Sequence, residues 1–254
     1  MREWFDIKQI DDDTYVISEY GHTEETHCYL LQGSERSVLI DTGIGISDIR
    51  KITDRICTLP VTVLTTHAHW DHIGSHASFE DIYVHADDIG WLRGHFPLPL
   101  EAVRNMIVTG LTAEPEGFDR NAYHIPVIPY AQTMRDGDVF DLGNRKVRVI
   151  HTPGHSPGHC CFYEEDRGYL YTGDLVYKGR LDANYPSTDP VQFCASVKKV
   201  SELNVTKVFP GHHDLDVPAS LIRKIRDAFA SLEDRGLLYQ GSGLYDYGCF
   251  QINI

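Results

Sequence analysis

The chain has 254 residues, of which 42% are hydrophobic, and this size and composition suffice for a well-buried core. Its formal charge of −14 gives an acidic surface that repels phosphate backbones, so we expect no nucleic-acid partner. No stretch approaches the roughly 20 apolar residues of a membrane span. The first residues also lack the apolar core of a signal peptide. We therefore expect a cytoplasmic protein that acts on a small molecule and does not bind a membrane.

Cysteine and histidine usage point in different directions. The six cysteines include no C-x-x-C pair and lie in apolar segments, so we expect buried free thiols instead of disulfides or a zinc knuckle. The 14 histidines are unevenly spread, and several are clustered. Their placement is therefore the main indication of function.

Short apolar or β-branched runs alternate with amphipathic stretches along the chain, which predicts an α/β fold. No linker or change in composition divides the sequence, so we expect a single domain over residues 1–254. Residues 218–235 have apolar side chains at helical spacing, which predicts a surface helix packed by one face.

Two segments allow more than one interpretation. Residues 88–133 are rich in proline and aromatic side chains, which is consistent either with a lid inserted over the site or with a peripheral decoration. The C-terminal residues end in a strand-like pattern, which would form a sheet edge or a homodimer contact.

Five predicted strands end in a polar turn that contains histidine or aspartate. These strand ends lie at residues 38–43, 63–69, 149–155, 169–174 and 208–213. In α/β folds, the loops at one end of the sheet form the ligand site. We therefore expect these turns to converge.

The densest group of candidate ligands is H-A-H-W-D-H at residues 67–72. In an extended segment His67 and His69 point the same way, and Asp71 and His72 lie in the turn that follows. Imidazole and carboxylate without thiolate suit zinc, and less selectively iron or manganese. One such run cannot fill two metal shells, so distant ligands are required. The strand ends supply three candidates, which are His155, Asp174 and His212.

With T-P-G-H at 152–155, T-G-D at 172–174 and P-G-H at 210–212 following in order, the chain resembles the metallo-β-lactamase superfamily from about Tyr15 to Asp214. The resemblance implies a four-layer αββα sandwich. It assigns His67, His69 and His155 to one metal and Asp71, His72 and His212 to a second, with Asp174 bridging them. It also implies that Asp41, in D-T-G, is an acid that supports the metal loops.

We expect two divalent metal ions, zinc first, with iron or manganese as alternatives. Two metals that share a water lower its pKa toward roughly 7, so hydroxide could attack the carbonyl of a small ester, thioester or lactone. Asp71 or Asp174 would carry the proton. Tyr177 follows Asp174 at a spacing similar to that in the acyl-homoserine lactonases of this superfamily. It is a candidate oxyanion donor, although a buried tyrosine bonded to backbone is the alternative.

Several activities remain open. G-D-L-V-Y-K-G-R and N-Y-P-S-T-D-P resemble the glyoxalase II and acyl-CoA thioesterase branches, in which case Lys178 and Arg180 could bind an anionic part of the substrate. Tyr177 favours a lactonase. A single-iron persulfide dioxygenase, a non-β-lactam amide hydrolase and a non-enzymatic binding module are the alternatives, and Asp174 disfavours antibiotic hydrolysis.

Overall fold

The computed structural model describes residues 3–113, 115 and 117–254. Its chain divides into two compact units, each with its own sheet and core. Unit 1 comprises Met1–Met134 and Asp141–Arg145, and unit 2 comprises Arg135–Phe140 and Lys146–Ile254. The prediction of a single domain stays a prediction.

Unit 1 is built on a seven-stranded sheet in which the strands follow one another in chain order. Its strands are β1 (Asp6–Asp11), β2 (Thr14–Ser18), β3 (His27–Gln32), β4 (Ser37–Ile40), β5 (Val61–Leu64), β6 (Asp81–His85) and β7 (Gln132–Met134). The pairs from β1 to β4 are antiparallel and those from β4 to β7 are parallel. Parallel β4 and β5 therefore end at the same edge, where residues 41 and 67–72 follow them.

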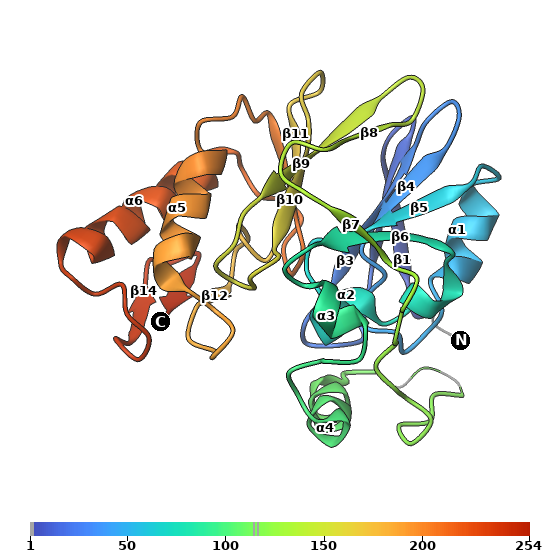
Figure 1. Ribbon diagram of the computed structural model, residues 1–254, viewed down its shortest axis with the longest axis horizontal. Helices are drawn as coiled ribbons and strands as arrows, with labels where there is room; N and C mark the ends of the chain where they lie inside the picture. Colours follow the sequence, from blue (N-terminus) through green and yellow to red (C-terminus); the bar gives the residue numbers. More distant parts are fainter. Residues whose placement is uncertain (1–2, 114, 116) are drawn as a thin grey trace. The chain divides into compact units, whose positions relative to one another are not determined.

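The core of unit 1 is formed by one face of this sheet and helix α1 (Arg50–Ile56). Figure 1 shows α1 beside β4 and β5. Ile49 and Ile52 pack with Leu39 and Val63, all of them buried. Burial of such aliphatic side chains contributes about 1.5–3 kcal/mol each, which fixes the sheet edge that carries the site.

The proline-rich segment 88–133 contains two helices, α3 (Ile89–Leu92) and α4 (Leu100–Gly110). Pro99 immediately precedes α4, a position where a missing backbone N–H costs nothing, so this proline does not break the helix. Val103 and Ile107 of α4 pack with Trp70 of the predicted metal loop. Positions 114 and 116 lie outside the described residues, and the role of the segment as a lid stays a prediction.

Unit 2 contains a five-stranded sheet in the order β13-β11-β10-β9-β8. Its strands are β8 (Val139–Asp141), β9 (Lys146–His151), β10 (Cys160–Glu164), β11 (Tyr169–Gly173) and β13 (Lys207–Pro210). Helices α5 (Pro190–Val200) and α6 (Ser220–Asp234) lie next to each other in Figure 1, and Phe193 of α5 stacks on Phe229 of α6 at 4.9 Å between ring centroids. This pairing gives unit 2 a core of its own.

The two C-terminal sequence predictions can be compared with the structure. The apolar side chains at helical spacing are all buried in helix α6, so the predicted surface helix is confirmed. They are Leu221, Ile222, Ile225, Ala228, Phe229 and Leu232. Strands β14 (Leu244–Asp246) and β15 (Gln251–Asn253) form a small sheet with β12 (Arg180–Asp182), in the order β12-β15-β14. The C-terminal residues thus form part of a sheet, and a dimer contact through them stays a prediction.

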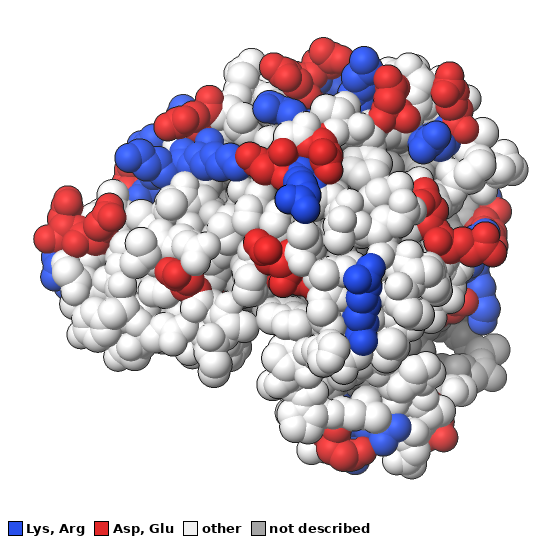
Figure 2. All heavy atoms as spheres, viewed as in Figure 1, with Lys and Arg blue, Asp and Glu red and all other residues white. Residues whose placement is uncertain are grey.

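Charged side chains are mixed on the surface. On the face shown in Figure 2, basic and acidic groups lie next to one another. In unit 2, for example, Lys199 pairs with Asp136 at 2.8 Å. Such exposed pairs contribute little to stability, about 0–1 kcal/mol, but they neutralise basic charge locally. Within the described part of the chain, no helix is long and apolar enough to cross a bilayer.

Candidate metal centre

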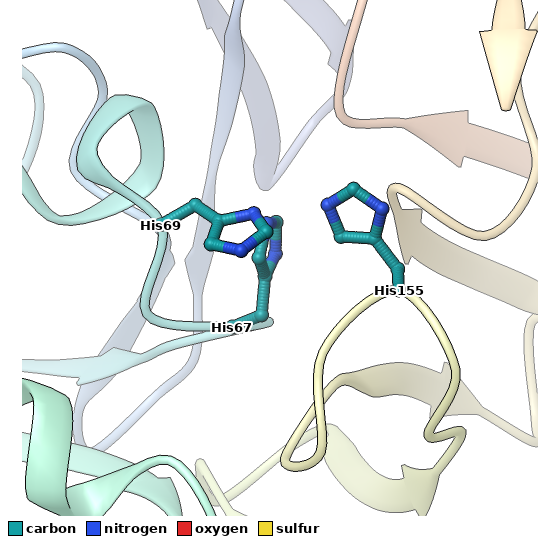
Figure 3. Close-up of side chains that lie close together, drawn as sticks. All are labelled: His67, His69 and His155. Carbon is teal, nitrogen blue, oxygen red and sulfur yellow. The ribbon is translucent and has the colours of Figure 1, made fainter. Parts of the chain in front are cut away.

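In unit 1 the run from His67 to His72 leaves the end of β5 and enters the short helix α2 (Trp70–Ile73). Figure 3 shows His67 and His69 projecting from this turn. Their ring centroids lie 4.5 Å apart, and the rings of His67 and His72 lie 4.2 Å apart. Asp71 Oδ2 is 3.6 Å from His72 Nε2. The turn therefore gathers the four predicted unit 1 ligands into one cluster.

Asp41 ties this cluster to the end of β4. Its Oδ1 accepts the backbone N–H of Thr66 at 2.7 Å, and its Oδ2 accepts the Thr66 hydroxyl at 2.6 Å. The same Oδ2 lies 2.8 Å from Nδ1 of His72, and both side chains are buried. A carboxylate on Nδ1 fixes the ring and directs Nε2 toward a metal. These contacts fit the supporting role that the family resemblance implies for Asp41.

His76 lies just beyond the cluster and is a structural residue. Its Nδ1 is 2.7 Å from the Thr42 hydroxyl, and its Nε2 is 2.8 Å from the Thr65 hydroxyl. Burial is the main cause that lowers the pKa of His76 to about 3, so the ring is neutral at physiological pH. Both ring nitrogens thus face hydroxyl groups.

In unit 2 the three predicted ligands come together around Asp174. Its Oδ2 lies 3.3 Å from Nε2 of His155, and its Oδ1 lies 3.1 Å from Nε2 of His212. Figure 3 draws His155 in the loop that follows β9. Its Nδ1 is 3.1 Å from the backbone carbonyl of Asp182. All three predicted ligands are buried.

Local backbone geometry explains why His155 follows a glycine. Gly154 has φ +138°, and a Cβ there would lie 2.4 Å from backbone atoms of Phe193 in α5. Only glycine allows that approach, and the approach holds the residue before His155 against helix α5.

His159 is a hydrogen-bond partner of Asp174. The backbone N–H of Asp174 donates to Nε2 of His159 at 3.1 Å, while Nδ1 of His159 faces the Thr152 hydroxyl at 2.9 Å. His159 thus positions Asp174.

Tyr177 is buried beside the unit 2 cluster. Its ring meets that of His212 edge-on at 5.6 Å between centroids, and its hydroxyl donates to the backbone carbonyl of Arg180. The residue is therefore close to a predicted ligand, and in the structure its hydroxyl bonds to backbone. Its catalytic role stays a prediction.

The two basic residues that follow Tyr177 are paired with carboxylates. Lys178 Nζ lies 2.5 Å from Asp214 Oδ2, and Arg180 Nε lies 3.0 Å from Asp182 Oδ1. An anionic substrate group would therefore compete with these carboxylates for the two cations.

Two buried acids of unit 1 were not singled out in the sequence. Asp88 Oδ2 accepts the backbone N–H of Ala68 at 3.2 Å, which fixes the residue between His67 and His69. Glu19 Oε2 accepts the backbone N–H of Ile44 at 2.8 Å. Burial is the main cause that raises the pKa of Glu19 to about 7. Neither acid has a motif spacing, and only their tertiary contacts identify them.

The donor sets of the two clusters fit divalent metal ions. His72 and His155 each have Nδ1 beside an oxygen acceptor, a carboxylate in one case and a carbonyl in the other. This arrangement selects the tautomer in which Nε2 carries the ligating lone pair. The carboxylate of Asp174 adds a ligand beside the Nε2 atoms of His155 and His212. Imidazole and carboxylate ligands are those of catalytic zinc, iron and manganese sites.

Comparisons with known proteins identify the family of the chain. A model of the metallo-beta-lactamase superfamily matches residues 23–212, more than half of the chain. The acyl-coenzyme A thioesterase MBLAC2 of Bos taurus is 30% identical over 230 residues, covering 83% of this chain and 81% of the bovine protein. The same protein from Homo sapiens is also 30% identical over 230 residues.

Solved structures show the same fold. A metallo-beta-lactamase family protein from Thermus thermophilus has a TM-score of 0.68 at 22% identity and covers 90% of this chain and 83% of its own. A protein solved in a di-iron-bound form has a TM-score of 0.60 at 27% identity, covering 79% of this chain and 93% of its own. These likenesses confirm the predicted fold class. The chain belongs to the metallo-beta-lactamase superfamily and is a hydrolase.

Proposed function

We propose that this chain hydrolyses acyl-coenzyme A thioesters at a centre of two divalent metal ions. The observation that carries the metal part is the placement of Asp174, whose two oxygens lie 3.3 and 3.1 Å from the Nε2 atoms of His155 and His212. The thioester part is supported by the relatives named acyl-coenzyme A thioesterase, which are 30% identical over most of the chain.

Seven residues would hold the metals. His67, His69 and His155 are assigned to one ion and Asp71, His72 and His212 to the other, with Asp174 shared, as the family resemblance implies. Divalent ions, with zinc as the first choice, would supply Lewis acidity and lower the pKa of a bound water toward roughly 7.

The protein's own residues orient these ligands and handle the proton. Asp41 holds the His72 ring by its Nδ1 at 2.8 Å. Asp71 or Asp174 would accept a proton from the attacking water and pass it to the leaving thiolate. Tyr177 would donate to the developing oxyanion after its hydroxyl leaves the Arg180 carbonyl.

A panel assay tests the proposal. The metal-loaded protein is given acyl-coenzyme A thioesters, acyl lactones, β-lactams and a persulfide, with release of free thiol and uptake of oxygen as readouts. We expect thiol release from the thioesters to be the fastest reaction. Faster lactone opening would replace the thioesterase assignment with a lactonase, and oxygen uptake with persulfide would replace it with a dioxygenase.

A matched pair of variants links the activity to the site. Asp174→Asn removes the shared carboxylate and should reduce both metal content and turnover. Asp216→Asn makes the same chemical change at an exposed position of unit 2 and should change neither. Equal activity in the two variants would contradict the proposed centre.

A further inference from the structure

Glu19 is a buried carboxylate that the proposed reaction does not use. It follows β2 and is 1% exposed. Oε1 accepts the indole N–H of Trp4 at 2.8 Å, and Oε2 accepts the backbone N–H of Ile44 at 2.8 Å. The side chain therefore connects the residues before β1 with the turn that follows β4.

The contact with this turn, residues 41–44, is close. A Cβ at Gly43 would lie 2.2 Å from Oε2 of Glu19, so the glycine admits the carboxylate. Burial of a carboxylate is costly unless hydrogen bonds compensate for it. The pKa of Glu19 is raised to about 7 mainly by that burial, and the charge of Asp71 adds to the effect. Because burial of this carboxylate costs free energy, its presence indicates that the turn requires a hydrogen-bond acceptor at this position.

The turn holds an unusual backbone conformation. Asp41 has φ +60° and Gly43 has φ +72°. A non-glycine residue in the left-handed region costs about 1–3 kcal/mol and persists only where its surroundings fix it. Thr42 N–H donates to the His72 carbonyl at 2.8 Å, Gly74 N–H donates to the Gly43 carbonyl at 2.8 Å, and Glu19 accepts from the end of the turn.

This conformation places the Asp41 carboxylate on His72. Oδ2 of Asp41 lies 2.8 Å from Nδ1 of His72, and Oδ1 accepts the Thr66 N–H at 2.7 Å. The contacts thus run from Glu19 through the turn to Asp41, and from Asp41 to a proposed metal ligand. All of these residues belong to unit 1.

We infer that Glu19 is a positioning residue for the metal-binding histidine His72, acting through the turn 41–44 and Asp41. The inference rests on the proposed metal centre. It assigns to Glu19 a share of the metal affinity without contact between Glu19 and the metal.

The chemistry of the two donors makes the inference testable. Trp4 and Ile44 both present an N–H, so the group between them must accept twice. In Glu19→Gln one acceptor is replaced by an NH₂ group that faces one of these donors. Trp4→Phe removes the indole donor while keeping a large aromatic ring. The double variant should therefore relieve the conflict.

The experiment measures the zinc affinity of the metal-free protein by titration. We expect Glu19→Gln to weaken zinc binding by about 10-fold, the lower end of the range seen when the direct hydrogen-bond partner of a ligand is lost, because Glu19 acts on His72 only through Asp41. The Trp4→Phe, Glu19→Gln double variant should recover most of this loss. Glu80→Gln, the same change at an exposed site of unit 1, should bind like the wild type. Cobalt(II) absorption spectra then report whether the ligand geometry has changed.

A second cycle separates positioning from general stability. If Glu19 acts through Asp41, Glu19→Gln should add little to the affinity loss already caused by Asp41→Asn. Should Glu19→Gln fail to fold, Glu19→Asp takes its place, because its shorter carboxylate keeps both acceptors but withdraws from the Ile44 N–H. Zinc affinity within about threefold of the wild type, or losses that add fully in the cycle, would overturn the inference. A wild-type protein that binds no zinc would instead refute the proposed metal centre.

Discussion

Acidification of the metal-free protein should act on two buried groups with opposite effects on stability. His76 lies between the hydroxyls of Thr42 and Thr65, and burial lowers its pKa from 6.5 to about 3. Below pH 6.5 the unfolded chain binds a proton that the folded protein does not bind. The contribution of neutral His76 to the free energy of unfolding is therefore complete above pH 6.5. It falls by about 1.4 kcal/mol per pH unit toward pH 3.

The contribution of Glu19 to folding stability changes with pH in the opposite direction. Burial raises its pKa from 4.5 to about 7, so between these values the folded protein holds a proton that the unfolded chain has released. Stability from this group falls by about 1.4 kcal/mol per unit as the pH rises from 4.5 to 7. In the wild type the two effects oppose each other between pH 4.5 and 6.5.

Urea unfolding across this pH range measures each effect as a difference from the wild type. Relative to the wild type, His76→Gln should gain stability by about 1.4 kcal/mol for each unit by which the pH falls. Glu19→Gln should lose stability at a similar rate, because only the His76 effect remains of the two. The contributions of the other titrating groups are common to the variant and the wild type, so they cancel in the difference. Parallel pH profiles for His76→Gln and the wild type would refute the assignment of His76 as a neutral buried bridge.

Three further substitutions test separate parts of the structure. Gly154→Ala should lower the free energy of unfolding by about 2 kcal/mol or more, because a Cβ would meet the backbone of Phe193. Urea unfolding measures this change, and a variant as stable as the wild type would contradict the prediction. Tyr177→Phe should lower turnover with metal content unchanged, and full activity would exclude an oxyanion role. Phe229→Ala in α6 should cost about 3–5 kcal/mol through the cavity left beside Phe193; a loss below about 1 kcal/mol, measured by the same unfolding assay, would show that this stacking adds little.

The fold could be predicted where one element carries a complete local pattern. Helix α6 has six apolar side chains at helical spacing, and all six are buried. Helix α4 was not predicted, because prolines dominate the segment before and after it and obscure its helical residues. It packs against Trp70, a contact between distant parts of the chain that local spacing does not reveal.

The clusters of candidate ligands could be predicted because several predicted strands end in a turn that contains histidine or aspartate. The strands place His67 to His72 on one turn and bring His155, Asp174 and His212 together within unit 2. Glu19 could not be found in the same way. Glu19 meets Ile44 across 25 residues, so its role is defined only by a tertiary hydrogen bond.

Counting metal ions against activity tests the central claim most directly. The protein is stripped with a chelator, reloaded with zinc in steps, and assayed at each step for thiol release from an acyl-coenzyme A. We expect no hydrolysis by the metal-free protein and full activity once two ions are bound per chain. Undiminished hydrolysis without metal, or no hydrolysis with two ions bound, would contradict a metal-dependent thioesterase.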